Sequence, residues 1–533
     1  MTQKTDVAIV GAGIAGIATA LDLLDRNIRV TLLDRNGPER FGGLAVESFG
    51  GIFFVGTPQQ KRLGIADSPE LAFQDWLSFG EIHEKDKIAR KWAETYVHTN
   101  YEKVFLWLRA KKVGFFPVVH WVERGLHRPG NSVPRFHMVW GTGSGLMERL
   151  ISQLKSHPNV SNLNIHFHHR VDAIQGVPNR VESITGVNEK TGEPFQYLAP
   201  HIVIGSGGFG GNIAEVKKHW YWDKVPEVIL NGSHPSADGR MHQVVEKLGG
   251  KLVNMKKMWM YAAGVHHPRP GFEGHGLSLV PPRSALWVSA KGKRIGPTPL
   301  VTGFDTRYLV ERITAQDEPH TWLVLNKKIA VKELGVSGSE FNTAIRDKKL
   351  LAFLVTVLFG NHSLVADLLE HCKDFLVADT VSELVNKMNR LTDKGHVNGD
   401  LLKLEIERYD GQIQRGLKYH NDDQLRRIAQ LRNYRGDRVR TCKFQAIEDK
   451  KAIPLIAIRV FPLSRKSLGG IQTDMSSRVL DSEQQPISGL YAVGEAAGFG
   501  GGGIHGIRAL EGTFLGSCIL TGRHAAEAIM EEL

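Results

Sequence analysis

The sequence predicts an α/β fold: a Rossmann-like nucleotide-binding domain with a parallel sheet and a β-meander, interrupted by an inserted, mainly helical cap domain of α+β type. Three stretches predict it. Residues 6–34 follow the pattern strand, glycine turn, helix, strand; residues 160–204 alternate as strands do; and residues 256–449 leave this rhythm and are rich in helix. We therefore expect residues 1–255 and 450–533 to form the two parts of the nucleotide-binding domain.

The first glycine turn, GAGIAG, lies between a strand of apolar residues and a helix. Gly11 permits the tight turn, Gly13 lets the backbone approach a pyrophosphate, and Gly16 lets the helix and strand pack closely. Ile14 and Ala15 complete the turn, at a helix start that offers unpaired N–H groups and a positive dipole end to phosphates. The pattern therefore predicts a dinucleotide cofactor.

The following strand, residues 29–33, ends in Asp34. We expect this carboxylate to accept hydrogen bonds from an adenosine ribose, with Arg35 beside it. A second glycine-rich stretch comes shortly after and can run past the pyrophosphate toward a flavin, which favours FAD over NAD. Its expected cofactor-binding residues are Gly42, Gly43, Leu44, Ser48, Gly50 and Gly51.

This stretch, GGLAVESFGGIFFVGTPQQKRLGIADSPELAFQDW, resembles the flavoproteins of the fumarate reductase and 3-ketosteroid dehydrogenase superfamily. MWMYAAG at Met258, HGLSLVPPRSALWVSAKGKRI from His275, GFDTRY from Gly303 and GFGGGGIHGIRALEGTFLG from Gly498 are similar to a group called FAD-binding dehydrogenases. The resemblance implies an FAD-dependent oxidoreductase. It would transfer a hydride between flavin N5 and a carbon adjacent to a carbonyl-type group of an enone, a ketosteroid-like compound or another small molecule, with an external electron donor or acceptor.

Residues 160–204 predict a strand that joins the nucleotide sheet at Val171, a β-meander, and a return strand that ends at Gly205. The glycines after it, Gly205, Gly207 and Gly208, imitate a second dinucleotide fingerprint and could indicate an NAD(P)H site. No strand ending in an acid follows at the expected distance, so we reject that alternative. By resemblance, this stretch closes the FAD domain near the adenosine.

The last eighty residues carry the second strong signal. A strand runs into Gly494 and Glu495, and by resemblance this pair reaches the ribityl chain of FAD. A helix is predicted to start at Gly512, where its N–H groups would stabilise an anionic reduced flavin or a developing enolate oxygen. The expected contacts on this helix are Thr513, Phe514 and Leu515.

Hydride transfer beside a carbonyl needs an acid or base and donors at the oxygen. The candidates are Tyr261, His505 and Arg508, with the Gly512 N–H as oxyanion donor. Each side chain also has a structural interpretation: Tyr261 as a packed aromatic residue, His505 as a turn residue, and Arg508 as a phosphate or carboxylate partner. Arg465 replaces the substrate-binding histidine of fumarate reductases, which disfavours a dicarboxylate substrate.

Some relatives tether the flavin through a histidine shortly before the Gly50-Gly51 pair, and that position is Leu44 here. Leucine has no nucleophilic nitrogen, so we predict that FAD is bound non-covalently. A different class of function, a flavin-binding redox sensor or scaffold without turnover, stays open. The large insertion favours substrate handling over sensing.

Composition excludes several classes. The 533 residues carry a net charge of +11, partly in residues 426–443, but no nucleic-acid module accompanies it, so we expect a solvated basic face and no nucleic-acid partner. Three widely spaced cysteines match no metal pattern and fit a reducing cytoplasm. No basic-then-apolar leader precedes the first strand. The longest apolar run, residues 350–359, is too short to span a bilayer. We expect a buried cap helix there, with a surface that docks to a membrane or an apolar substrate as the alternative.

Overall fold

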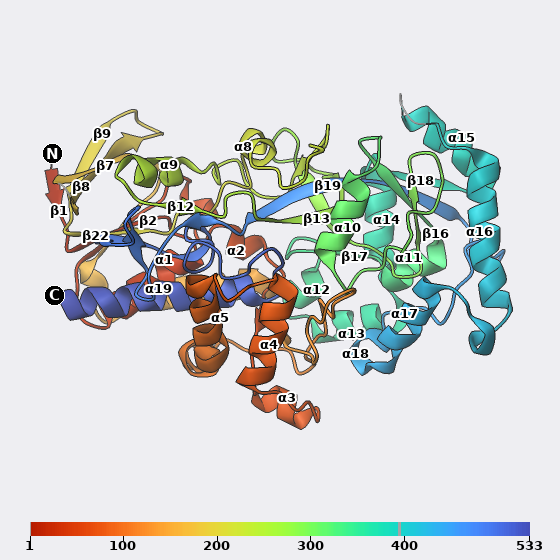
Figure 1. Ribbon diagram of the computed structural model, residues 1–533, viewed down its shortest axis with the longest axis horizontal. Coiled ribbons are helices and arrows are strands. Elements are labelled where there is room, and N and C mark those ends of the chain that lie inside the picture. Colours follow the sequence, from red (N-terminus) through yellow and green to blue (C-terminus); the bar gives the residue numbers. More distant parts are fainter. Residues whose placement is uncertain (1, 178, 393–395) are drawn as a thin grey trace. The chain divides into compact units, whose positions relative to one another are not determined.

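The computed structural model describes residues 2–177, 179–392 and 396–533 (Figure 1). The chain forms two compact units. The first comprises Met1–Tyr221, Ser233–Trp259 and Arg465–Leu533, and the second comprises Trp222–Gly232 and Met260–Ser464. The chain crosses between them at Tyr221/Trp222 and at Gly232/Ser233, and again within two long strands, β13 (Met258–His266) and β19 (Leu455–Ser467). The sequence boundaries at 255/256 and 449/450, as a statement about domains, stay a prediction.

The centre of the first unit is a parallel sheet with the order β22-β10-β2-β3-β6. These strands are β2 (Val7–Val10), β3 (Val30–Leu33), β6 (Leu163–His166), β10 (His201–Ile204) and β22 (Pro486–Ala492). Val7 pairs with Val30 on one side and with His201 on the other. All four residues of β2 are buried, as a strand covered on both faces requires.

Two long helices pack together in this unit (Figure 1): α1 (Ile14–Leu24) and α19 (Thr513–Glu532). Every residue of α1 is buried. The helices approach closely because small residues lie at the contact: a Cβ on Gly522 would come within 2.6 Å of the Ala15 carbonyl oxygen, and the Thr19 hydroxyl donates to the Gly522 carbonyl at 3.0 Å. The two ends of the sequence therefore share one core.

The β-meander consists of β7 (His169–Val177), β8 (Arg180–Asn188) and β9 (Pro194–Leu198), joined antiparallel, with β1 (Thr2–Lys4) added beside β9. One expectation needs correction. The strand that joins the nucleotide sheet next to β3 is β6, whereas Val171 lies on β7 and pairs with Gly186 of the meander. A sharp turn at His168, with φ of 60°, separates the two strands.

Helices and short strands complete the first unit. They are α2 (Leu44–Glu47), β4 (Gly51–Phe53), α3 (Pro58–Arg62), α4 (Pro69–Gly80), α5 (Lys87–Asn100), a π-helical turn (Tyr101–Leu106), α6 (Trp107–Ala110), β5 (Phe136–Met138), α7 (Thr142–Lys155), α8 (Ile213–Lys218), α9 (Arg240–Lys247), β12 (Leu252–Val253), β20 (Gly470–Ile471) and β21 (Arg478–Leu480). Residues 69–112 are thus largely helical, as their apolar periodicity suggests.

A buried ion network fixes the segment that leads into β5. The Arg135 guanidinium, fully buried, donates to Asp67 at 2.8 Å and to Asp75 of α4 at 2.6 Å. It also donates to the Asn131 side-chain oxygen at 3.0 Å. Because a buried charge must be paired and hydrogen-bonded, these contacts fix the backbone on both sides of Pro134. That backbone is the support on which β4 and β5 pair.

The second unit contains helices around an eight-stranded sheet of order β15-β16-β19-β13-β14-β17, with β11 and β18 paired to β19. The remaining strands are β11 (Leu230–Asn231), β14 (Gly276–Val280), β15 (Leu286–Ser289), β16 (Thr321–Asn326), β17 (Gly335–Val336) and β18 (Phe375–Ala378). The helices are α10 (Thr306–Thr314), α11 (Lys327–Glu333), α12 (Thr343–Arg346), α13 (Leu350–Phe359), α14 (His362–His371), α15 (Val381–Leu391), α16 (Gly399–Gln414), α17 (Asp423–Asn433) and α18 (Arg435–Arg438).

The α/β class with an inserted α+β segment is confirmed, but one expectation about the insertion is wrong. Residues 350–359 do form a helix, α13, yet none of them is buried. Hydropathy alone suggested a core helix; the fold instead places this one at the surface. Among the described residues, no single helix has the length and apolar character to cross a membrane, although α13 and α14, bent by 80°, pass that test as a pair.

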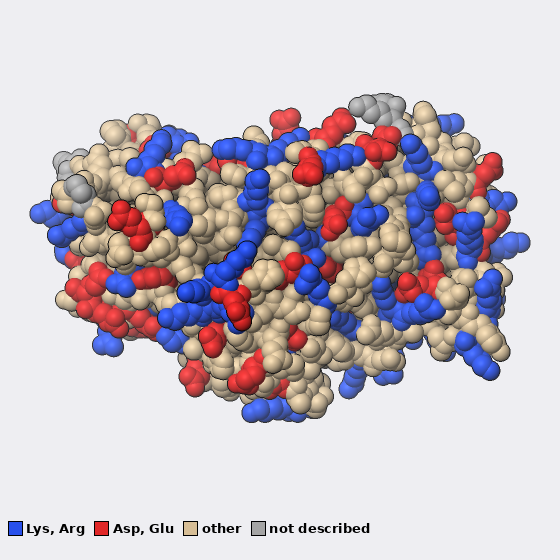
Figure 2. Space-filling model, viewed as in Figure 1, with Lys and Arg blue, Asp and Glu red and all other residues tan. Residues whose placement is uncertain are grey.

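Charge on the surface is mixed. Acidic and basic side chains lie beside one another over much of the face in Figure 2. The net charge of +11 is therefore not gathered into one stripe on that face. This distribution is consistent with the solvated basic surface expected from the sequence.

Candidate functional site

The glycine turn after β2 has the geometry that its sequence predicts. Gly11 has φ of 109°, and a Cβ there would lie 2.4 Å from the Gly205 carbonyl oxygen. A Cβ on Gly16 would lie 2.2 Å from the Gly11 carbonyl oxygen, which explains why helix and strand can pack here. A Cβ on Gly13 would meet nothing within 4 Å. The backbone therefore packs closely against Gly11 and Gly16, whereas the space beside Gly13 is open.

Two helices begin at this site without a side-chain cap. The N-cap of α1 is Gly13 and that of α19 is Gly512, and neither glycine offers a side chain to the first N–H groups. Gly494, the turn that ends β22, lies between them: a Cβ there would be 2.9 Å from the Ala15 side chain. The N-terminal and C-terminal glycine motifs are thus in contact, and helix N-termini of this kind favour anions.

Asp34 lies at the end of β3 and faces a pocket. Its carboxylate accepts from the Ala12 N–H at 2.8 Å and from the Asn36 N–H at 2.8 Å. The cavity volume is about 80 Å³, which is room for part of a cofactor rather than for a whole one. Its lining includes five of the residues predicted from the sequence: Gly11, Asp34, Arg35, Val171 and Gly208. The fold therefore brings these distant residues together at one pocket.

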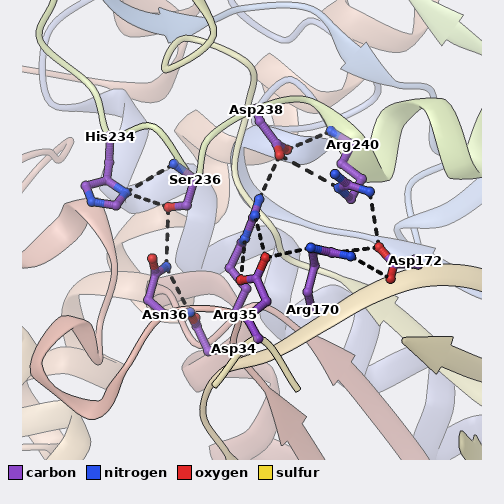
Figure 3. Close-up of polar contacts among 10 residues, drawn as sticks. Asp34, Arg35, Asn36, Arg170, Asp172, His234, Ser236, Asp238 and Arg240 are labelled. Atoms are coloured by element: carbon purple, nitrogen blue, oxygen red, sulfur yellow. Dashed lines mark hydrogen bonds and ion pairs between the residues drawn. The ribbon is translucent and has the colours of Figure 1, made fainter. Parts of the chain in front are cut away.

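A network of alternating charges forms the rim of this pocket (Figure 3). Arg35 donates to Asp238 at 2.7 Å and to Glu189 at 3.0 Å. Arg170 donates to Glu189 at 2.8 Å and to Asp172 at 2.8 Å, and its hydrogen bond lowers the pKa of Asp172. Because each acid has a basic partner, the rim is nearly neutral and fixed in place.

Sequence reasoning missed part of this pocket. Besides the predicted residues, it is lined by Asn36, His169, Arg170, Ser206, Ser236, Asp238, Gly239, Arg240 and Met241. Ser236 and Asp238 belong to the polar turn before α9, and Asn36 donates to the Ser236 hydroxyl at 3.3 Å (Figure 3). In the sequence, these residues show only as a polar turn before a helix. The sequence does not show that this turn meets Asn36 across the pocket.

The second glycine stretch runs along the first. Gly42 forms a bridge with Gly13, its N–H donates to the Ala12 carbonyl at 3.0 Å, and Gly43 has φ of 58°. Leu44 starts α2, and the Ser48 hydroxyl donates to the Ala45 carbonyl at 2.8 Å. The second glycine stretch is therefore held against the first glycine turn, where the pyrophosphate is expected to bind.

Gly50 and Gly51 allow a close approach at the start of β4. A Cβ on Gly50 would lie 2.5 Å from the Thr142 backbone, and one on Gly51 would penetrate the Phe136 ring. The same strand contacts the start of α19, because the Phe53 N–H donates to the Gly512 carbonyl at 2.9 Å. β4 therefore connects the glycine stretch to the C-terminal helix.

Glu495 is half-buried beside the third glycine stretch. It accepts from the Ser467 N–H at 2.9 Å and from the Ser467 hydroxyl at 3.1 Å. A Cβ on Gly208 would lie 2.3 Å from its carboxylate. Burial raises the pKa of Glu495, so its carboxylate depends on these donors.

A basic group of β19, which the sequence alone does not assign, lies beside the start of α19. The Lys466 Nζ lies 4.2 Å from the centroid of the Phe514 ring, and burial lowers the pKa of Lys466 to about 8. Thr513 is buried, with its hydroxyl donating to the Leu510 carbonyl at 2.6 Å, and Leu515 is half-buried. A cation and helix N–H groups therefore lie at one end of α19.

His505 is enclosed by aromatic rings. It stacks on Trp76 with centroids 5.4 Å apart and contacts Phe499 at 5.3 Å and Phe514 at 5.1 Å. Among the described residues neither ring nitrogen has a hydrogen-bond partner. Burial lowers its pKa to about 3, so the imidazole is neutral near pH 7 and is a weak base there.

The other two predicted catalytic side chains are placed differently. Arg508 forms an ion pair with Glu81, which also binds Arg128 at 3.0 Å. Tyr261 belongs to the second unit, where it packs against Leu230, Phe461 and Leu463. The structure thus brings His505 and Gly512 to the start of α19, pairs Arg508 with an acid, and gives Tyr261 an apolar environment. Their catalytic roles stay predictions.

The first unit fits an FAD. Four features lie along one continuous set of contacts: open space at Gly13, a pocket beside Asp34, uncapped helix starts at α1 and α19, and buried ring nitrogens at His505. No group of three or more metal-ligating side chains occurs among the described residues.

Comparison with known proteins agrees with this geometry. The model of the FAD binding domain family matches residues 6–515. A KsdD-like steroid dehydrogenase of Mycobacterium tuberculosis is 40% identical over 99% of this chain and 96% of its own length. The 3-ketosteroid Δ1-dehydrogenase of Sterolibacterium denitrificans has a similar fold, with a TM-score of 0.70 and 17% identity over the full length of both chains. A flavocytochrome c3 fumarate reductase gives the same TM-score at 19% identity, over 99% of this chain and 78% of its own.

Proposed function

We propose a substrate class for this chain, which belongs to the FAD-binding-domain family of flavoproteins and is an FAD-dependent dehydrogenase acting on CH–CH bonds. The proposed substrate is a 3-ketosteroid or a related apolar ketone that is oxidised to an enone. The observation that carries the substrate proposal is the likeness, over nearly the whole chain, to a protein named as a steroid dehydrogenase. The alternative of a redox sensor without turnover is not supported, because these relatives are enzymes.

Bound FAD supplies a hydride acceptor and donor. The chain's own contribution begins at α19, where the Gly512 N–H is the proposed donor to a substrate carbonyl or enolate oxygen. Lys466, at the same helix start, supplies positive charge that offsets negative charge developing near it. These groups act in a buried site, where water screens them little.

We propose the acid and base roles as follows. His505 is neutral, so it acts as a hydrogen-bond partner or a proton acceptor. Arg508, held by Glu81, orients a polar group of the substrate or cofactor. Tyr261 is the proposed proton-handling group of the second unit.

The test is anaerobic photoreduction of the flavin followed by mixing with a panel of steroid dienones, simple enones and fumarate. We expect reoxidation by the steroid or enone compounds and none by fumarate, because Arg465 replaces the histidine of fumarate reductases. In the reverse direction, a saturated 3-ketosteroid should bleach the oxidised flavin. Reoxidation by fumarate alone would reject the substrate proposal.

We also propose that FAD is held without a covalent bond. The position at which some relatives carry a tethering histidine is Leu44, which begins α2. Acid precipitation should leave the yellow colour in the supernatant. Colour retained in the protein pellet would show that another side chain forms the link.

We propose a cytoplasmic location and an external electron partner. All three cysteines, Cys372, Cys442 and Cys518, are free and buried, as expected in a reducing compartment. Reoxidation rates with oxygen, quinones and dyes would identify the class of electron acceptor.

A further inference from the structure

Helix α13 presents an apolar stripe to solvent. Its sequence, LLAFLVTVLF, contains no charged residue, and none of its residues is buried. Leu351, Leu354, Val355, Leu358 and Phe359 recur at helical spacing on one face, and their exposed fractions range from 43% for Leu354 to 80% for Leu351. Phe353, Thr356 and Val357 are half-buried and form the opposite face.

Such a stripe is unusual on a folded surface. Single exposed apolar side chains are common, but contiguous patches mark interaction sites. A helix that is apolar on every side normally lies in a core or a bilayer. At ten residues α13 is about half the length that spanning a bilayer requires, so it can lie in an interface but cannot cross one.

Basic side chains border the stripe at its N-terminal end. Before α13 come Arg346, Lys348 and Lys349, and the single acid among them, Asp347, is paired with Arg346 at 2.7 Å and Lys349 at 3.4 Å. The helix N-terminus adds its positive dipole end to this cluster.

The other end of α13 contacts a lysine-bearing helix. A Cβ on Gly360 would lie 2.5 Å from Val331 of α11, and the Asn361 N–H donates to the Val331 carbonyl at 2.8 Å. In α11, Lys328 is exposed and Lys332 half-buried, while Glu333 is buried and bound to Ser284. These contacts place Val331 of α11 beside the C-terminal end of α13, so the basic cluster that borders the stripe is the one before its N-terminal end, residues 346–349.

We propose that α13 is a membrane-docking helix that inserts its apolar stripe into the surface of a bilayer containing anionic phospholipids. An apolar face with a basic border is the arrangement by which interfacial helices bind, through burial of the apolar side chains and attraction of lipid headgroups. A second copy of this chain fits less well, because its α13 carries no acidic residue to pair with the basic cluster before the helix. The inference does not depend on the proposed substrate.

Flotation of the holoenzyme with vesicles tests the proposal. We expect binding to vesicles of phosphatidylcholine mixed with phosphatidylglycerol, weaker binding to phosphatidylcholine alone, and a decrease with salt. Leu351→Glu with Leu358→Glu should weaken binding by at least about tenfold, since two inserted side chains become charged. Lys348→Glu with Lys349→Glu should remove the preference for phosphatidylglycerol.

A matched control is Leu417→Glu, which places the same charge at another leucine of the second unit that is 61% exposed. It should bind vesicles as the original protein does. All variants should keep their flavin and their turnover with a soluble dye, which shows that they are folded. No binding by the original protein, or equal binding by the Leu351→Glu, Leu358→Glu variant, would overturn the proposal.

The position of the helix can be measured directly. Because the three native cysteines are buried, a Leu351→Cys variant can be labelled selectively with an environment-sensitive dye. Its emission should shift to the blue on mixing with the anionic vesicles. An oligomer in lipid-free buffer that Leu351→Glu with Leu358→Glu dissociates would instead assign the stripe to a second copy of the chain and overturn membrane docking.

Discussion

Asp34 shows how one side chain serves both the fold and the proposed cofactor. Its two oxygens each accept a backbone N–H, from Ala12 and from Asn36, so it ties the end of β3 to the glycine turn. Oδ1 also accepts from the Asn36 side-chain amide at 3.1 Å, so Oδ2, which binds the Ala12 N–H, is the oxygen that retains a second acceptor site. The carboxylate can therefore hold the turn and accept from a ribose at the same time.

Asp34→Asn should weaken FAD binding by roughly tenfold or more, because a hydrogen bond to a charged acceptor is replaced by one to a neutral amide. Titration of the apoprotein with FAD, followed by quenching of flavin fluorescence, measures the change. Asp6→Asn is the control, since Asp6 lies near the other end of β2 and binds Arg29. Equal affinity of Asp34→Asn and the original protein would reject the ribose role.

His505→Phe separates a packing role from a chemical one. The ring has aromatic neighbours and no hydrogen-bond partner among the described residues, so phenylalanine can occupy its place. The folded state keeps His505 neutral while the unfolded state protonates below about pH 6.5, so the histidine costs stability as the pH falls from 6.5 toward 3. The variant should therefore be more stable at pH 5, by up to roughly 2 kcal/mol.

Urea unfolding at pH 5 and pH 8 measures this difference, which should vanish at pH 8. Turnover measured beside it tests the proposed catalytic role: a folded His505→Phe enzyme with unchanged kcat and KM would show that the imidazole only packs. A variant that is less stable at both pH values would contradict the assignment of a neutral, unpaired ring.

Among the secondary-structure elements, the helix start of α1 depends on two glycines with opposite surroundings. Gly13 faces open space and has φ of −80°, which any residue can adopt. Gly16 faces the Gly11 carbonyl at a distance that no Cβ can occupy. The space beside Gly13 is therefore open to a ligand, whereas the fold requires a glycine at Gly16.

Gly13→Ala should leave the FAD-free protein as stable as the original but should reduce FAD binding, because the methyl group lies where a pyrophosphate approaches. Gly16→Ala should lower the stability of the FAD-free protein itself. Thermal unfolding of both apoproteins, with FAD titrations of those that fold, gives the comparison. Destabilisation of the apoprotein by Gly13→Ala would contradict the open geometry at that position.

The segment between α4 and β5 depends on Arg135. Its removal leaves Asp67 and Asp75 buried without their partner, so Arg135→Met should lower the free energy of unfolding by about 3–5 kcal/mol. The control is Arg29→Met, whose ion pair with Asp6 is exposed and should contribute less than about 1 kcal/mol. Urea denaturation measures both, and similar values for the two variants would reject the structural role of the network.

For the whole molecule, several buried histidines predict sensitivity to acid. In the first unit burial lowers the pKa of His137 and of His242 to about 4, as it lowers that of His505. Their neutral rings favour the folded state above about pH 6.5, and this stability is lost as the pH falls from 6.5 toward 4. A pKa lowered by one unit corresponds to about 1.4 kcal/mol, so the combined loss should reach several kcal/mol.

Release of flavin fluorescence during thermal unfolding, recorded between pH 7.5 and pH 4.5, reports on the first unit. The midpoint should be nearly constant above pH 7 and should fall steadily below pH 6.5. A midpoint that is constant down to pH 4.5 would show that these rings become protonated within the folded protein.

The sequence by itself determined the elements whose pattern is local. The strand, glycine turn and helix at the start of the chain, the acid at Asp34, and the helix from Thr513 follow from short-range periodicity and from the conformations that glycine allows. FAD and the dehydrogenase class followed from these motifs together with the resemblance to known flavoproteins.

Only the tertiary structure decided which distant residues meet. Ser236 and Asp238 join Asp34 at one pocket, and Lys466 lies over Phe514, because separate segments close around a common core. The apolar run of α13 shows the limit most clearly. Its composition fits a core helix, but composition does not show whether another element covers it. Here nine apolar residues and Thr356 lie unburied because no neighbouring element among the described residues buries them.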